Sequence, residues 1–212
     1  MKVLGLRLLW QRRFVIIFEK GGAMFKRWRR LDGPGLEILS LTEDDDGIAA
    51  RSVIIDSGDK AFGMTADWQL DPNWRSRSLL LQVVDAAATT RQLQIVRTGP
   101  ASWEVDGKAR ADLDGCAEID VSATPFCNGL ALRYLGEKPG ELTALFVLAP
   151  ELTVQPSRQR YEKLENGWRY VDLGAAKGFT AILTFDDYLI VRDYEELFET
   201  LGSGPINSDS FG

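Results

Sequence analysis

The chain has 212 residues, of which 45% are hydrophobic and 26% charged, and its formal net charge is −6. These proportions are those of an ordinary globular protein and exclude disorder for most of the chain. The first 30 residues hold nine Lys and Arg and one acid, which leaves 16 bases and 30 acids for the rest. An acidic body argues against nucleic-acid binding and favours a soluble, cytoplasmic protein.

No histidine occurs in the sequence. Its absence excludes Ser-His-Asp and Cys-His catalysis, and with them nearly all catalytic zinc and copper sites. The two cysteines, Cys116 and Cys127, are too few for a disulfide scaffold, so we expect both to be reduced and buried. No phosphate-binding or dinucleotide-binding glycine motif occurs, and we predict neither a cofactor nor a metal site.

Residues 1–23 contain an apolar stretch that Gln11, Arg12 and Arg13 interrupt, and the apolar run after them is too short for a signal peptide or a membrane span. We therefore expect a poorly ordered leader or an upstream extension, with the natural start at Met24. A targeting signal and a basic membrane-surface helix are the alternatives. No stable membrane insertion is expected.

From Leu36 onward the hydrophobic period is mostly two, which is typical of half-buried strands. The clearest run covers residues 61–70, where Phe62, Met64, Ala66, Trp68 and Leu70 fall on one face. Further strands are expected at 36–42, 48–56, 75–84, 89–97, 101–105, 117–121, 142–148, 152–161, 167–173 and 178–185. Turn-forming pairs such as Asn166-Gly167 separate them, so the pattern predicts a meandering antiparallel sheet without βαβ units.

One short helix is predicted after Thr124-Pro125, because this pair fits an N-cap followed by proline at the first helical position. The helix should end at Gly136 and be enclosed by strands. Residues 193–201 form a second candidate helix, since their apolar residues recur at helical spacing.

The predicted domain organisation follows from these elements. Residues 24–201 are expected to form a single β domain, because no linker divides them. Residues 202–212 are rich in Gly and Ser and are expected to form a flexible tail.

The densest polar cluster covers residues 103–128. A carboxylate pair of the kind that glycosidases use is one interpretation of it. A calcium loop fails on register, because Asp114-Gly115 at the fifth and sixth positions would make Arg110 the first ligand. The simplest interpretation is turn chemistry, with Glu118 and Asp120 on the exposed face of a strand.

Five groups of residues, in order between Met24 and Phe198, together resemble a bacterial family described as putative glycolipid-binding, formerly a domain of unknown function. They are residues 28–37, Trp103–Gly107, the run Leu113–Cys116, Glu118–Ser122, Thr124–Phe126, Asn128, Leu130 and Arg133, then Gln159–Tyr161 after Pro150, and Phe179–Ala181 with Asp186 and Tyr194. The chain departs from the family after Asn128. There Gly129–Tyr134 replaces the usual Thr-Leu-Pro-Ile-Arg-Arg, so any role of the second arginine is lost or moved.

The resemblance implies a mainly-β spiral roll, in which a long antiparallel sheet wraps around one short helix, and it implies a homodimer. It also implies a likeness to periplasmic lipoprotein carriers, which is the origin of the glycolipid label. This sequence lacks a clean export signal, unlike those carriers.

Three functions follow as hypotheses: a non-catalytic protein that binds a lipid or glycolipid, a carboxylate-dependent hydrolase acting on a sugar or lipid headgroup, and a dimeric scaffold with a filled core. If a headgroup is bound, the expected ligand-binding residues are Asp114, Asp120, Asn128 and Arg133, with Trp103 as an apolar wall. Asn128 offers a donor and an acceptor, and Arg133 offers a fork suited to phosphate or carboxylate. The alternative is that Arg133 pairs with Asp114 or Asp120 and holds the helix against the sheet.

Overall fold

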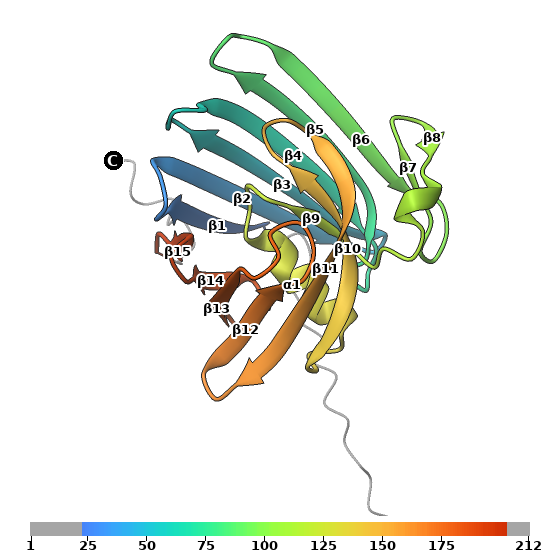
Figure 1. Ribbon diagram of the computed structural model, residues 1–212, viewed down its shortest axis with the longest axis vertical. Helices are drawn as coiled ribbons and strands as arrows, with labels where there is room; N and C mark the ends of the chain where they lie inside the picture. The colour runs from blue at the N-terminus through green and yellow to red at the C-terminus, as the bar shows by residue number, and fades with distance from the viewer. Residues whose placement is uncertain (1–22, 203–212) are drawn as a thin grey trace, which may run out of the picture.

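Fifteen strands form one open sheet that curls around a single α-helix in the computed structural model, which describes residues 23–202 (Figure 1). The expectations for the leader before residue 23 and for the tail after residue 202 lie outside the described residues. The helices are η1 (Ala111–Leu113), a 3₁₀ turn, and α1 (Phe126–Tyr134). The strands are β1 (Ala23–Arg30), β2 (Gly35–Asp44), β3 (Gly47–Asp56), β4 (Phe62–Leu70), β5 (Ser76–Asp85), β6 (Thr90–Arg97), β7 (Trp103–Val105), β8 (Lys108–Ala109), β9 (Ile119–Val121), β10 (Gly140–Leu148), β11 (Thr153–Leu164), β12 (Gly167–Asp172), β13 (Thr180–Phe185), β14 (Val191–Tyr194) and β15 (Phe198–Thr200).

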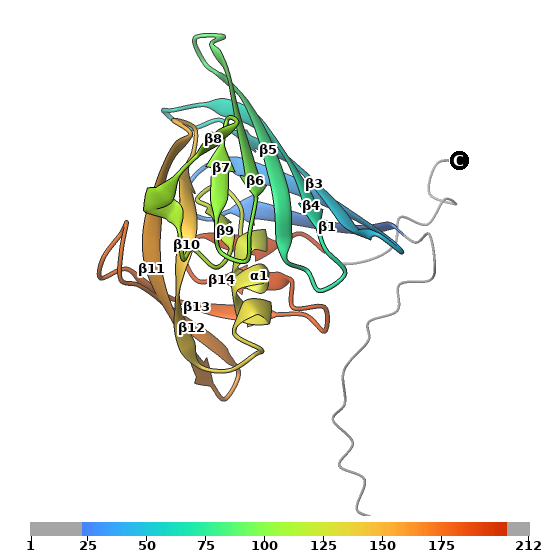
Figure 2. The same cartoon turned by 90° about the vertical axis from the view of Figure 1, so that its right-hand side faces the viewer.

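The predicted mainly-β class, a long sheet around one short helix, is confirmed, and every predicted strand range contains a strand. In β4 the five apolar residues expected on one face are all buried. Strands β1–β6 form one wall of the roll and β10–β13 the opposite wall, with α1 between them (Figures 1 and 2). The two cysteines are free and buried, as expected.

The basic segment around Trp28, which the period-two pattern does not identify as a strand, belongs to the sheet. The segment forms β1, which lies in the middle of the strand order between β2 and β15. Trp28 is fully buried and donates a hydrogen bond from Nε1 to the carbonyl of Val191 over 2.9 Å. Because strand side chains alternate, Arg27 and Arg29 point outward on either side of it.

The helix begins at Phe126, one residue later than predicted, with Pro125 in place of Thr124 as the N-cap, and it ends before Gly136 as predicted. Thr124 Oγ1 accepts a hydrogen bond from the N–H of Phe126 over 3.2 Å, which satisfies one free donor of the first turn. Gly136 has a φ of 64°, the left-handed conformation that commonly stops a helix. All residues of α1 from Phe126 to Leu132 are buried, as expected for a helix enclosed by strands.

Two other expectations need correction. The sheet is not wholly antiparallel, because β9 runs parallel to β10 and α1 forms the crossover between them. Buried residues lie on every side of α1, so its sequence lacks the one-sided apolar period that would have indicated a βαβ unit. The second candidate helix, 193–201, is instead the hairpin of β14 and β15, in which Tyr194 pairs directly with Phe198.

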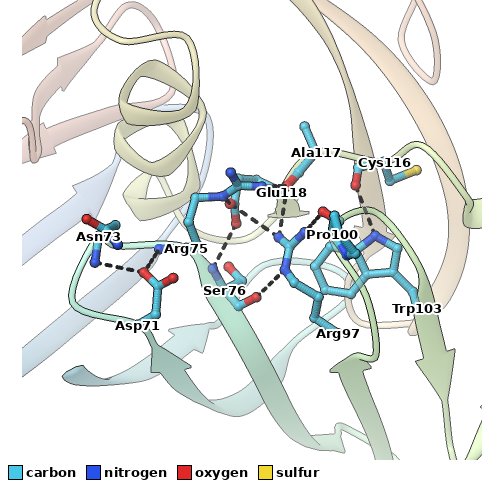
Figure 3. A network of polar contacts seen from close by, with 10 residues as sticks. All are labelled: Asp71, Asn73, Arg75, Ser76, Arg97, Pro100, Trp103, Cys116, Ala117 and Glu118. Carbon is cyan, nitrogen blue, oxygen red and sulfur yellow. Dashed lines mark hydrogen bonds and ion pairs between the residues drawn. The ribbon is translucent and has the colours of Figure 1, made fainter. Parts of the chain in front are cut away.

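The two ends of the sheet, β8 and β9, do not pair with each other, and polar contacts bridge them instead (Figure 3). Trp103 donates from Nε1 to the carbonyl of Cys116 over 3.0 Å. Arg97 donates to the carbonyl of Ala117 over 2.9 Å, and its guanidinium lies 4.0 Å from the centroid of the Trp103 ring. These contacts fasten the segment before β9 against β6 and β7.

Glu118 is central to this bridge and is 1% exposed, so the expectation that it lies on a solvent face is wrong. Its carboxylate forms ion pairs with Arg75 and Arg97 and accepts a hydrogen bond from the N–H of Ser76 over 3.1 Å (Figure 3). Ile119 and Val121 are buried on one face of β9, and Asp120 on the other face is half-buried, so the expectation that Asp120 lies on an exposed face is wrong as well. The alternation of side chains along β9 therefore does not separate core from solvent.

Candidate functional site

A cavity of about 230 Å³ lies beside the N-terminal end of α1. Its polar lining comes from Asp120 of β9 and Ser122 just after it, from Thr124 and Asn128 at the start of the helix, and from Asp172 at the end of β12. Its other walls are mainly aromatic and come from Phe146, Tyr170, Phe179, Tyr194 and Phe198. The roll thus brings together residues from both ends of the second half of the chain.

Asp120 is half-buried in the wall of the cavity. Burial raises the pKa of its carboxyl to about 6, a hydrogen bond from Gln159 lowers the pKa, and the like charge of Asp172 raises it. Gln159 donates this bond from Nε2 to Oδ2, and it provides the one side-chain hydrogen bond to Asp120 among residues 23–202. The carboxyl therefore titrates close to neutral pH while part of it faces the cavity.

A chain of hydrogen bonds fixes the polar groups behind the cavity. Asn128 donates from Nδ2 to the phenol oxygen of Tyr161 over 3.0 Å, and Tyr161 donates in turn to Oε1 of Gln159 over 3.4 Å. Gln159 then donates to Asp120. Because each amide has a fixed partner, the orientation of Asn128 and Gln159 is set by the network rather than by a ligand.

The second carboxyl at the cavity is Asp172, which is 4% exposed. It accepts hydrogen bonds from the Tyr170 hydroxyl over 3.1 Å and from the N–H of Gly174 over 2.7 Å. Burial raises the pKa of the Tyr170 phenol, so this hydroxyl keeps its proton and remains a donor to Asp172.

A third carboxyl, Glu37 of β2, lies behind Thr124 and is 2% exposed. Its Oε1 accepts hydrogen bonds from Ser52 and, over 2.7 Å, from Thr124. Its Oε2 has no hydrogen-bond partner within the described part of the chain. Burial raises the pKa of Glu37 to about 7, against the lowering effect of the two hydroxyls.

Of the five residues expected to bind a ligand, the structure brings Asp120 and Asn128 together at the cavity, and Trp103, Asp114 and Arg133 do not line it. Trp103 belongs to the bridge between the ends of the sheet. Asp114 is exposed in the turn after η1.

Arg133 lies near the C-terminal end of α1, where it donates to the carbonyl of Tyr188 and stacks 3.9 Å from the centroid of Trp74. Its recorded hydrogen bond and ring contact thus join α1 to two loops. The expected ion pair with Asp114 or Asp120 is not among the contacts of the described residues.

Sequence reasoning missed Gln159, Tyr161, Tyr170 and Asp172. The sequence held part of the signal. Gln159 and Tyr161 are two residues apart, as are Tyr170 and Asp172, so each pair shares one face of its strand. In the sheet, Gln159 pairs with Asp172 and Tyr161 with Tyr170. Polar and aromatic residues at alternate positions of two neighbouring strands thus marked the wall of the cavity, in β12, and the hydrogen-bond network behind it, in β11.

Across residues 23–202 no group of three Cys, Asp or Glu side chains is placed to hold a metal ion. In the same range no helix has the length and hydropathy needed to cross a bilayer.

The chain is similar to the crystal structure of a DUF1089 family protein from Pseudomonas aeruginosa. The two share 28% identity with a TM-score of 0.66, over 78% of this chain and 91% of that chain. A search of curated proteins finds no match. A family model described as "Putative glycolipid-binding" matches residues 26–200. The resemblance found in the sequence is thereby confirmed, and the chain belongs to the family described as "Putative glycolipid-binding".

Proposed function

We propose that the protein binds the polar headgroup of a lipid or glycolipid in the cavity at Asp120, without catalysing a reaction. The observation that carries this proposal is the combination of carboxyl and amide groups with aromatic rings around one small cavity. Aromatic faces accept the C–H surface of a headgroup, and convergent polar groups orient it. The family description agrees with such a ligand.

The size of the cavity limits what it holds. At about 230 Å³ it lies below the range of roughly 300–1,000 Å³ that encloses a drug-sized ligand. It therefore suits a headgroup alone, and the acyl chains of a bound lipid would lie outside it.

Native mass spectrometry of the protein purified from its own host tests this proposal. We expect a retained lipid on the wild-type protein and loss of it from Asp120→Asn, which keeps the shape of the side chain. Asp114→Asn is the matched control, because Asp114 is exposed and does not line the cavity. Equal retention by both variants would place the ligand elsewhere and refute the proposed site.

A carboxylate-dependent hydrolase is the second candidate, and one observation favours it. A general acid needs a pKa raised toward the working pH and a second carboxyl nearby. Asp120 has a pKa of about 6 and lies within electrostatic reach of Asp172. Release of sugar from a panel of alkyl glycosides, lost in Asp120→Asn, would support hydrolysis; binding of the same glycosides without turnover would support the binding function.

We also propose that the homodimer implied by the family uses the outer face of β2, β3 and β5. Five apolar side chains are exposed there: Leu36, Ile38, Val53, Ile55 and Val84. Strand pairing makes them contiguous, because Leu36 faces Ile55 and Ile38 faces Val53 in adjacent strands. A groove of about 400 Å³ runs over Val53, Ile55 and Val84, and an exposed apolar surface of this kind is typical of an interface.

A further inference from the structure

The charge of the cavity at Asp120 is one-sided. Two carboxyls line it, Asp120 and Asp172, and no Lys or Arg is among the described residues that line it. The guanidinium of Arg30 lies 5.9 Å from the centroid of the Phe198 ring, but it is paired with Asp32 and Asp56. A half-buried site with acids and no base favours a ligand that supplies positive charge.

The hydrogen-bonding groups point to the same conclusion. The Tyr170 hydroxyl donates to Asp172, the Gln159 amide donates to Asp120, and the Asn128 amide donates to Tyr161. These three donors are used within the protein, which leaves the carboxyl oxygens of Asp120 and Asp172 as acceptors for a ligand. The hydroxyls of Ser122 and Tyr194, which also line the cavity, can accept as well as donate. An ammonium group has only donors to offer and matches such a site.

Aromatic rings complete the arrangement. Tyr170, Phe179 and Tyr194 all line the cavity and form a triangle, with ring centroids 6.2–6.4 Å apart. Phe198 extends this group, 6.2 Å from Tyr194. Several aromatic rings around one small space are the arrangement that recognises quaternary ammonium and alkylated amine groups, each ring attracting a cation within about 6 Å of its centroid.

We propose that the cavity selects a headgroup with a cationic nitrogen, a primary amine or a quaternary ammonium. This inference rests on the proposed headgroup site and narrows its ligand. An amino sugar and a choline-type headgroup share this chemistry. A phosphate, sulfate or carboxylate group would meet two like charges and no donor of opposite charge, so it is excluded from the cavity.

Three amphiphiles with the same dodecyl chain separate the possibilities: dodecyltrimethylammonium, dodecyl glucoside and dodecyl sulfate. Calorimetric titration of the full-length protein, at concentrations below those that form micelles, should give at least about tenfold tighter binding of the cation than of the glucoside. The sulfate should not bind in the cavity. Choline and glucosamine, titrated as free molecules, then distinguish a quaternary from a primary ammonium.

Variants show whether the binding belongs to the cavity. Asp120→Asn combined with Asp172→Asn should reduce the preference for the cation to less than about threefold. Phe179→Leu changes a half-buried ring and should weaken binding of the cation without unfolding the protein. This variant tests the site even if the double variant does not fold. Asp114→Asn removes an exposed carboxyl outside the cavity and should change nothing.

Two outcomes overturn this inference in different ways. Binding of the glucoside that equals or exceeds that of the cation, and that Phe179→Leu weakens, would refute the cationic selectivity and leave the headgroup site standing. The site itself would be refuted if all three amphiphiles bind and neither the double variant of Asp120 and Asp172 nor Phe179→Leu alters their binding.

Discussion

Thr124 donates a hydrogen bond to Oε1 of Glu37 over 2.7 Å, which ties the chain two residues before α1 to the third residue of β2. Ser52 donates to the same oxygen. The two hydroxyls stabilise the charged form of the carboxyl, but burial has the larger effect and raises the pKa of Glu37 from 4.5 to about 7. The folded protein therefore holds this proton more tightly than the unfolded chain does.

Glu37→Gln should consequently stabilise the protein at high pH. In the wild type, the stability linked to Glu37 is present below about pH 4.5 and is lost as the pH rises to about 7, because the folded state binds more protons in that window. The amide has no charge to bury, so we expect a gain of about 1–3 kcal/mol at pH 8 and almost none at pH 4.5. Urea unfolding at both pH values measures this, and an equal change at the two values would contradict it.

Removing the carboxyl of Glu118 should weaken the bridge between the ends of the sheet. Arg97 is only 12% exposed at its side chain and would lose its buried partner. We expect Glu118→Leu to lower the free energy of unfolding by about 3–5 kcal/mol. Glu141→Gln is the control, because Glu141 and Arg158 form an exposed pair worth about 0.5 kcal/mol or less. Similar losses of unfolding free energy from both variants would show that the buried pair stabilises the protein no more than the exposed pair does.

Arg133→Met tests the role of the arginine that the sequence placed at the site. The variant loses the stack on Trp74 and the hydrogen bond to the carbonyl of Tyr188. We expect a loss of about 1–2 kcal/mol in unfolding free energy and unchanged ligand retention, because Arg133 does not line the cavity. Loss of ligand from a variant that melts like the wild type would contradict this placement.

The proposed dimer interface predicts the effect of a charge on the outer face. Ile55→Lys places an ammonium in the apolar patch, where Ile55 is 55% exposed, and should shift the protein to the monomer in light scattering after size exclusion. Ile182→Lys makes the same substitution on β13, at a residue 39% exposed, and should leave the oligomeric state unchanged. A monomeric wild type, or an Ile55→Lys dimer, would argue against this interface.

Local patterns predicted most of the fold because they depend on near neighbours. The period of two identified the long strands, and Thr124-Pro125 with Gly136 identified the helix. The strands that were missed are short or atypical. The hairpin of β14 and β15 has too few residues to show alternation and was predicted as a helix. β1 carries charged residues around Trp28 and was not predicted as a strand.

The candidate site was predicted only where its residues are close in sequence. Asp120 and Asn128 lie close to the start of α1 in the sequence; both were predicted as ligand-binding residues, and both line the cavity. Asp172 and Tyr170 reach the cavity through the pairing of β11 with β12, and such a long-range register cannot be read from local periodicity. Trp103 and Asp114 lie near Asp120 in the chain, but the turn after η1 carries them to the end of the sheet.

The titration of Asp120 depends on few neighbours. Tyr161, Tyr170, Tyr194 and the thiol of Cys127 all have pKa values that burial raises above their ordinary range, so they stay neutral near pH 6. The pKa of Asp120 is therefore set by three factors: its own burial, the hydrogen bond from Gln159 and the charge of Asp172.

Carboxyl-detected NMR titration should give Asp120 a pKa of about 6 and move it in opposite directions in two variants. Asp172→Asn removes a like charge and should lower the pKa, but not to 3.8, because burial is the larger cause. Gln159→Leu removes the hydrogen bond to the charged form and should raise the pKa further. Asp114→Asn should leave it unchanged. An Asp120 that titrates near its ordinary value in the wild type, or shifts the same way in both variants, would contradict the electrostatics of the cavity and remove the main support for a hydrolase.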